Sequence, residues 1–189
     1  MSDRGPTRRA ALALLMVGLS FGPAAGARAQ AATAPAEVAA QLPAARLLGS
    51  GTLRFFGLSV YDARLWAGEG FDAQDPAGAP LALELVYRRS LDGTRIAERS
   101  LVEMQRVDGI GAEQGQRWLA AMQALFPDVR AGDRLTGLHL PGPGLRFFLN
   151  SKPIGELRDP EFARRFLGIW LGPNTSEPAL RRALLGRAP

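Results

Sequence analysis

Few residues of this chain have the chemistry of a metal ligand or a nucleophile. The sequence has no cysteine and a single histidine, His139, so it offers no disulfide, no thiolate ligand and no histidine pair for a metal ion. No GxSxG serine motif accompanies His139, which we expect either to face solvent on a strand or to lie hydrogen-bonded at the edge of the core. Catalytic residues stay unassigned, and we expect no metal and no cofactor.

Two further patterns fall short of known functional motifs. The Gly49–Gly51 segment enters an expected strand, whereas a dinucleotide-binding fingerprint leaves a strand and opens a helix. Glu98, Glu103 and Glu113 are spread over helical segments. We interpret these glutamates as parts of solvated helix faces, and not as a catalytic carboxylate pair.

The N-terminal segment has the pattern of a cleavable signal peptide. Arg4, Arg8 and Arg9 precede an apolar stretch over residues 10–21, which is shorter than the roughly 20 residues that span a membrane. A small-x-small site follows, so we predict cleavage after Ala29; the alternative is an uncleaved membrane anchor. The paired arginines leave both Sec and twin-arginine export open. The predicted location is outside the cytoplasm, periplasmic if the source is a Gram-negative bacterium.

Most of the chain's basic excess lies in this segment. The whole chain has a net charge of +5, but without residues 1–29 it has 19 basic and 17 acidic residues and a net charge of +2. Its arginines are also interspersed with acids, which gives no electrostatic footprint for nucleic acid. About 160 residues remain, enough for one domain with a hydrophobic core.

The rest of the chain has the pattern of a group of strands, two helices, a second group of strands and two further helices. Residues 30–44, rich in alanine and proline, predict a flexible linker. Strands are expected over 52–56, 58–67, 81–88, 133–140, 145–149 and 154–157. Helices are expected over 92–106, over 112–125, from Asp159, and from Ser176 to Leu185. We expect Gly57 to form a bulge or a close backbone approach, and Ser90 or Asp92 to cap the first of these helices. This order predicts an α+β fold, with a layer of helices on one face of an antiparallel sheet.

Three segments occur in an order that is typical of one family. They are the stretch from Gly49 through Phe55 to Trp66, the turn at Asn150–Gly155, and the C-terminal segment Gly168–Gly186. Together they resemble the bacterial chalcone isomerase-like domain proteins over roughly residues 45–186, and we assign the domain to 45–187. The resemblance implies an open-faced β-sandwich, in which a large antiparallel sheet and a layer of helices enclose an apolar cleft.

The resemblance implies two possible activities. Plant enzymes of the superfamily close a flavanone ring without a cofactor, using an arginine near the first strand, a threonine on the second strand, and a tyrosine and an asparagine on the next helix. Here Phe56 stands at the threonine position, and the helix at 92–106 has neither tyrosine nor asparagine. Related non-catalytic members hold fatty acids through an arginine and a tyrosine. We therefore predict a binding protein, with an isomerase of the intramolecular lyase type as the alternative.

The expected ligand is a small apolar acid, fatty-acid-like or phenolic. Arg54 is the candidate carboxylate partner, because a guanidinium fork suits a carboxylate, although Arg46 also lies close to the family's arginine position. Tyr61 and Tyr87 are candidate hydroxyl donors. The alternative to a binding role is that Arg54 is a surface residue of its strand and that both tyrosines are packed aromatic residues of the sheet. A third hypothesis is a periplasmic interaction module whose segment 159–185 docks a protein partner, against the alternative that this segment covers its own sheet.

Overall fold

The structure is a computed structural model that describes residues 1, 32–106, 109–142 and 144–187. The folded unit begins at Ala32. The predicted signal peptide and its cleavage site therefore fall outside the described residues, apart from Met1. Within the described ranges, no helix combines the length and the apolar character that crossing a membrane requires.

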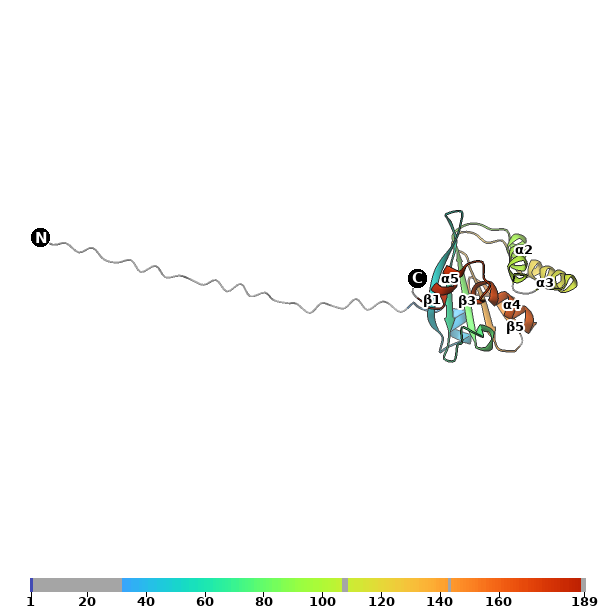
Figure 1. Cartoon of the computed structure of the whole chain (residues 1–189), viewed down its shortest axis with the longest axis horizontal. Coiled ribbons are helices and arrows are strands. Elements are labelled where there is room, and N and C mark those ends of the chain that lie inside the picture. Colours follow the sequence, from blue (N-terminus) through green and yellow to red (C-terminus); the bar gives the residue numbers. More distant parts are fainter. Residues whose placement is uncertain (2–31, 107–108, 143, 188–189) are drawn as a thin grey trace. The chain divides into compact units, whose positions relative to one another are not determined.

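Along the folded unit, groups of strands and helices follow one another in the predicted order (Figure 1). In chain order they are α1 (Ala36–Gln41), β1 (Arg46–Phe55), β2 (Leu58–Ala67), the 3-10 turn η1 (Pro76–Gly78), β3 (Leu81–Tyr87), α2 (Gly93–Met104), α3 (Ala112–Leu125), β4 (Arg134–Leu140), β5 (Gly144–Leu149), β6 (Lys152–Leu157), α4 (Pro160–Leu171) and α5 (Pro178–Leu184).

The strands form one six-stranded antiparallel sheet in the order β1-β2-β3-β4-β5-β6. Each strand pairs with the next one in sequence, and Tyr61 on β2 lies opposite Tyr87 on β3. Because successive side chains of a strand point to opposite faces, this register places both tyrosines on the same face. The α+β class with an open antiparallel sheet is as predicted.

One face of the sheet carries the helix layer. In Figure 1, α4 and α5 lie over the sheet, and α5 packs against β1 while α4 contacts β5. The inward side chains of α4, Phe162, Phe166, Leu167 and Trp170, are all buried in the main core. The apolar stripe of the 159–185 segment therefore covers the chain's own sheet, as the alternative to a partner-docking segment supposed.

The opposite face carries α1, which corrects part of the predicted linker. We expected residues 30–44 to remain without regular structure, but Ala36–Gln41 form a helix whose Val38 is fully buried. Val38 and Leu42 pack with Trp66 and Leu138 on the far face of the sheet. The apolar far face supplies the burial that this short segment could not obtain by itself.

Helix ends and turns follow local chemistry closely. Asp92, and not Ser90, caps α2, since its carboxylate accepts a hydrogen bond from the backbone N–H of Arg95 at 3.3 Å. The N-cap of α5 is Glu177 and not the expected Ser176, because Pro178 takes the first helical position. Gly57 belongs to a tight hairpin turn with a φ of 79° and forms neither a bulge nor a close approach.

Candidate functional site: a cavity between sheet and helices

A cavity of about 340 Å³ lies between the sheet and the helix layer. It is bounded by β1, β2, β3 and β4 on the sheet side and by α2, α4 and the segment before α5 on the other. This volume falls in the range of small-molecule pockets, about 300–1,000 Å³. The antiparallel sheet and its helices thus leave space for a ligand where the resemblance implied a cleft.

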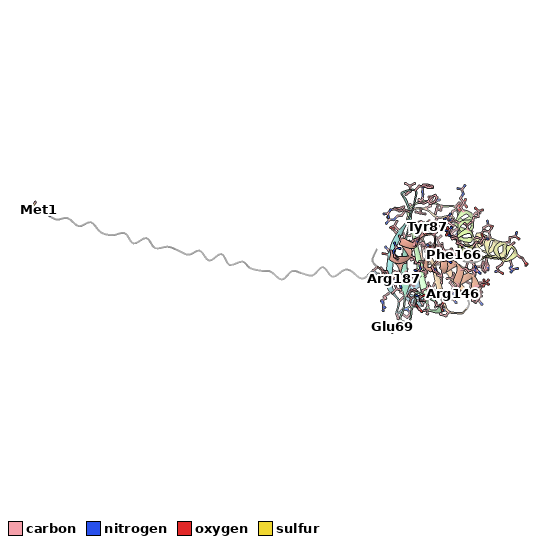
Figure 2. All side chains as sticks on the ribbon, in the orientation of Figure 1. Met1, Glu69, Tyr87, Arg146, Phe166 and Arg187 are labelled. Atoms are coloured by element: carbon pink, nitrogen blue, oxygen red, sulfur yellow. The ribbon has the colours of Figure 1, made fainter. Side chains whose placement is uncertain are left out.

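The cavity is apolar at its floor. Its apolar lining residues are Leu53, Phe55, Val60, Leu85, Leu91, Ile96, Phe126, Leu135, Phe166, Ile169 and Trp170. Tyr87 from β3 and Phe166 from α4, both labelled in Figure 2, are nearly inaccessible to solvent. A ligand in this space would meet hydrocarbon and aromatic rings on most sides.

Two tyrosine hydroxyls project from the sheet side of the cavity. Tyr61 and Tyr87 both line it, and their rings meet edge to face with centroids 5.8 Å apart. The indole N–H of Trp170 donates to the Tyr61 hydroxyl at 2.9 Å, whereas no described residue hydrogen-bonds the Tyr87 hydroxyl. Burial raises the pKa of both phenols above the ordinary value, so both stay protonated and retain a proton to donate.

Arginines mark the edge of the cavity, but Arg54 does not line it. Arg54 is exposed on β1, whereas its neighbours Leu53 and Phe55 line the cavity. The lining arginines are Arg89, Arg95 and Arg99, and all three are exposed. Since the apolar floor is buried and these guanidinium groups are solvated, the cavity opens to solvent on their side.

The arginines at the edge could have been found from helical spacing. Arg95 and Arg99 are four residues apart on α2, and Ile96 and Ser100 repeat the same spacing beside them. Residues at i and i+4 lie on the same face of a helix, so the two arginines share one face and the two cavity-lining side chains share the adjacent face. Arg89, which precedes α2 in a loop, gives no comparable periodic signal.

Glu103 corrects one expectation from the sequence. We interpreted it as part of a solvated helix face, but it is buried and lines the cavity. Its carboxylate lies 2.5 Å from the guanidinium of Arg99 and 3.6 Å from that of Arg106. Neither arginine donates a well-aligned hydrogen bond, so both carboxylate oxygens are buried without a hydrogen-bond partner among the described residues.

His139 lies away from the cavity and has an internal role. It is buried on β4, where its two ring nitrogens lie 3.0 Å from the carbonyl oxygen of Gly144 and 2.8 Å from that of Ala77. His139 thereby ties the start of β5 to η1, as expected of a hydrogen-bonded histidine in the core. In the described part of the chain, no group of three or more metal-binding side chains is close enough to hold a metal ion.

This fold and the sequence together define the family. Residues 27–186 match the family model described as chalcone isomerase-like, so the chain belongs to that family. An uncharacterized protein of Haemophilus influenzae is 34% identical over 108 residues. That match covers 57% of this chain and 52% of the relative, so the match spans about half the length of that relative.

A solved structure of a related fold extends this comparison. The chain is similar to the crystal structure of a fatty-acid binding protein from Arabidopsis thaliana, with a TM-score of 0.58 and 16% sequence identity. The similarity covers 76% of this chain and 87% of the plant protein. At this identity the similarity demonstrates the chalcone isomerase-like fold, in agreement with the six-stranded sheet and its helices.

Proposed function

We propose that the protein binds a small apolar acid, such as a fatty acid, in the cavity between sheet and helices. The observation that carries this proposal is the combination of an apolar floor with exposed arginines at one edge. The fatty-acid binding activity in the name of the plant protein of similar fold agrees with it. We further propose that this binding takes place after export, in line with the signal-peptide pattern of residues 1–29.

The hydrocarbon part of the ligand would occupy the floor. Leu85, Phe126, Leu135 and Phe166 are all nearly inaccessible to solvent, so an alkyl chain placed among them leaves water completely. Each buried CH₂ group contributes about 0.8 kcal/mol to such transfer. Burial of the chain supplies most of the affinity, and the polar groups determine its orientation.

The carboxylate would lie at the arginine edge and not at the floor. The buried carboxylate of Glu103 would repel a second carboxylate, whereas Arg95 and Arg89 have no ion-pair partner among the described residues. Arg99 already pairs with Glu103 and can contribute only in part. Of the two hydroxyl donors predicted from the sequence, Tyr87 has no hydrogen-bond partner among the described residues, so its O–H is available to donate to the ligand.

A binding role fits these residues better than ring closure. The residue at the catalytic threonine position, Phe56, is 89% exposed at the tip of the β1–β2 hairpin and does not line the cavity. It can therefore neither donate to a bound ketone nor hold a water against it. Removing one such donor from an active site typically costs 10²–10³ in rate, and the helix at 92–106 also lacks the tyrosine and the asparagine, so we expect chalcone to cyclise at close to its spontaneous rate.

Calorimetric titration of the purified, lipid-free protein with lauric acid and with lauryl alcohol tests the proposal. We expect lauric acid to bind more tightly than the alcohol. Arg95→Gln should weaken the affinity for the acid roughly tenfold and leave the affinity for the alcohol unchanged. Arg117→Gln is the matched control, because Arg117 lies on α3, pairs with Glu113 and does not line the cavity. Equal affinities for acid and alcohol would contradict the arginine role, and no binding of either would contradict the proposal.

A further inference from the structure

The tip of the β1–β2 hairpin exposes three large apolar side chains. Phe55, Phe56 and Leu58 are 57%, 89% and 55% exposed, and we call them the hairpin-tip patch. The rings of Phe55 and Phe56 stack edge to face with centroids 4.5 Å apart. Apolar side chains that cluster in solvent, next to one another, mark a surface that meets another apolar phase.

The backbone at this tip adds a second argument. Phe56 has a φ of 48° and Gly57 a φ of 79°, as in a two-residue hairpin turn that favours Asn-Gly. A bulky residue in the left-handed region is unfavourable, and strained positions of this kind cluster at functional sites. Since Phe56 is almost fully exposed, packing within the fold does not compensate for this strain.

The hairpin-tip patch is continuous with the mouth of the cavity. Phe55 belongs to the patch and also lines the cavity, together with Leu53 and Val60 from the same hairpin. Because β3 ends at Tyr87, opposite Tyr61, the tip projects beyond the neighbouring strand at the end where β3 leads to α2 (Figure 1). An apolar path therefore runs from the exposed tip to the buried floor.

The charge around the patch is mainly positive. Arg54, on the hairpin, and Arg89 and Arg95, at the cavity edge, are exposed and form no ion pair with any residue that the structure describes. The acids nearby have other partners: Asp62 binds Arg88 and Thr52, Asp92 caps α2, and Glu103 pairs with Arg99. The remaining acid at the cavity, Glu177, is the N-cap residue of α5, but its side chain makes no capping hydrogen bond, so its charge offsets one of these three arginines.

We propose that the hairpin-tip patch docks the protein on the surface of an anionic lipid bilayer. An apolar tip and a cationic border are the two signals that together give stable attachment to such a surface, since each alone is weak. Docking there would place the mouth of the cavity against the lipid, where an apolar acid can enter or leave without crossing water. The transfer of an acid between cavity and lipid rests on the proposed function, but attachment to the bilayer does not require a ligand.

Co-sedimentation with vesicles of equal parts phosphatidylcholine and phosphatidylglycerol tests the docking. We expect the ligand-free protein to sediment with these vesicles, to do so less at high salt, and to stay in solution with pure phosphatidylcholine. Phe56→Asn should reduce partitioning about tenfold, because it removes the exposed ring while Asn-Gly suits the turn. Arg54→Gln should reduce it about fivefold.

A matched pair of variants separates the patch from exposed apolar area in general. Leu58→Ser and Val102→Ser remove side chains of similar exposure, 55% and 52%, but Val102 lies on α2 and outside the cavity lining. We expect only Leu58→Ser to lower partitioning. Equal losses in the two variants, or wild-type partitioning in Phe56→Asn, would overturn the proposal, as would a failure of the wild-type protein to bind the vesicles.

Two measurements without vesicles complete the test. Phe56→Asn should bind lauric acid as the wild type does, so that a failure of docking and a failure of ligand binding can be told apart. Sedimentation velocity should give the same molecular mass for both proteins. A wild-type dimer that Phe56→Asn converts to a monomer would show instead that a second copy of the chain covers the patch, and would refute membrane docking.

Discussion

Trp170 on α4 donates its indole N–H to the hydroxyl of Tyr61 on β2 at 2.9 Å, joining the helix layer to the sheet beside the cavity. Both residues line the cavity, and the bond holds their side chains against each other in its wall. A cavity that is left open within a core needs such contacts, because apolar walls without a filler tend to collapse. The bond therefore contributes to the shape of the site as well as to stability.

Removing the Tyr61 hydroxyl should destabilise the protein more than removing the hydroxyl of its neighbour Tyr87. Tyr61→Phe leaves the indole N–H of Trp170 without an acceptor and should lower the free energy of unfolding by about 1–3 kcal/mol. Tyr87→Phe removes a hydroxyl without a partner and should change it by less than about 0.5 kcal/mol. Urea unfolding of both variants measures the difference, and equal losses would contradict the assigned bond.

Gly49 allows α5 to approach the sheet closely, which gives the Gly49–Gly51 segment a structural role. A Cβ at Gly49 would lie 2.1 Å from the backbone oxygen of Ala183. Gly49→Ala should therefore destabilise the protein by at least about 2 kcal/mol, because backbone must shift. Gly68→Ala is the control: a Cβ there meets nothing within 4 Å. Thermal unfolding of both variants tests this, and a tolerated Gly49→Ala would disprove the close approach.

Asp159 should make stability depend on acidic pH. Burial alone would raise its pKa, but hydrogen bonds from the N–H of Phe162 and the indole of Trp118 lower it below the ordinary value. The unfolded state then binds more protons, so stability is full above the ordinary carboxyl pKa of about 4 and decreases as pH falls through the lowered pKa.

The corresponding variants separate the charge of Asp159 from its capping role. Asp159→Ala loses the cap of α4 and should destabilise by about 2 kcal/mol at neutral pH. Asp159→Asn keeps a capping side chain, so it should cost less at neutral pH and lose less stability on acidification than the wild type. Urea midpoints measured from neutral to acidic pH give both values. An unchanged pH dependence in Asp159→Asn would rule out the lowered pKa.

The short helix α1 should contribute to stability although it lies far from the cavity. Val38 is fully buried on the far face, and the carboxylate of Glu37 accepts a hydrogen bond from the Thr136 hydroxyl at 2.7 Å. Val38→Ala should lower the free energy of unfolding by roughly 1–3 kcal/mol. Ala40→Ser, at an exposed position of the same helix, should change it little. Equal, negligible effects would mean that α1 does not pack as described.

The sequence predicted the regular elements well where apolar periodicity was strong. The apolar spacing along α4 matches its buried residues, and the alternation along β3 located that strand although both of its faces are buried, so both elements could be located without tertiary information. In contrast, α1 has only six residues, and it forms a helix because it packs on a face of the sheet that only the folded chain provides. Composition alone therefore predicted a linker there.

The site was harder to predict than the fold. Tyr61 and Tyr87 were selected because the resemblance implies a tyrosine beside the carboxylate, and the strand register places both on the cavity face. Arg54 was selected from its position near a family motif, but strand alternation and a register shift after Leu53 leave it outside the cavity. The burial of Glu103 depends on how α2 packs over the sheet, which its polar neighbours on the helix do not reveal.

Native mass spectrometry of the protein with lauric acid tests the central claim most directly, with Ser100→Phe as a cavity-filling variant. Ser100 is buried on α2 and lines the cavity, whereas Val102 is exposed on the same helix, so Val102→Phe is the control. We predict one bound lauric acid per chain in the wild type and in Val102→Phe, and none in Ser100→Phe. Equal uptake by all three proteins, or none by the wild type, would contradict ligand binding in this cavity.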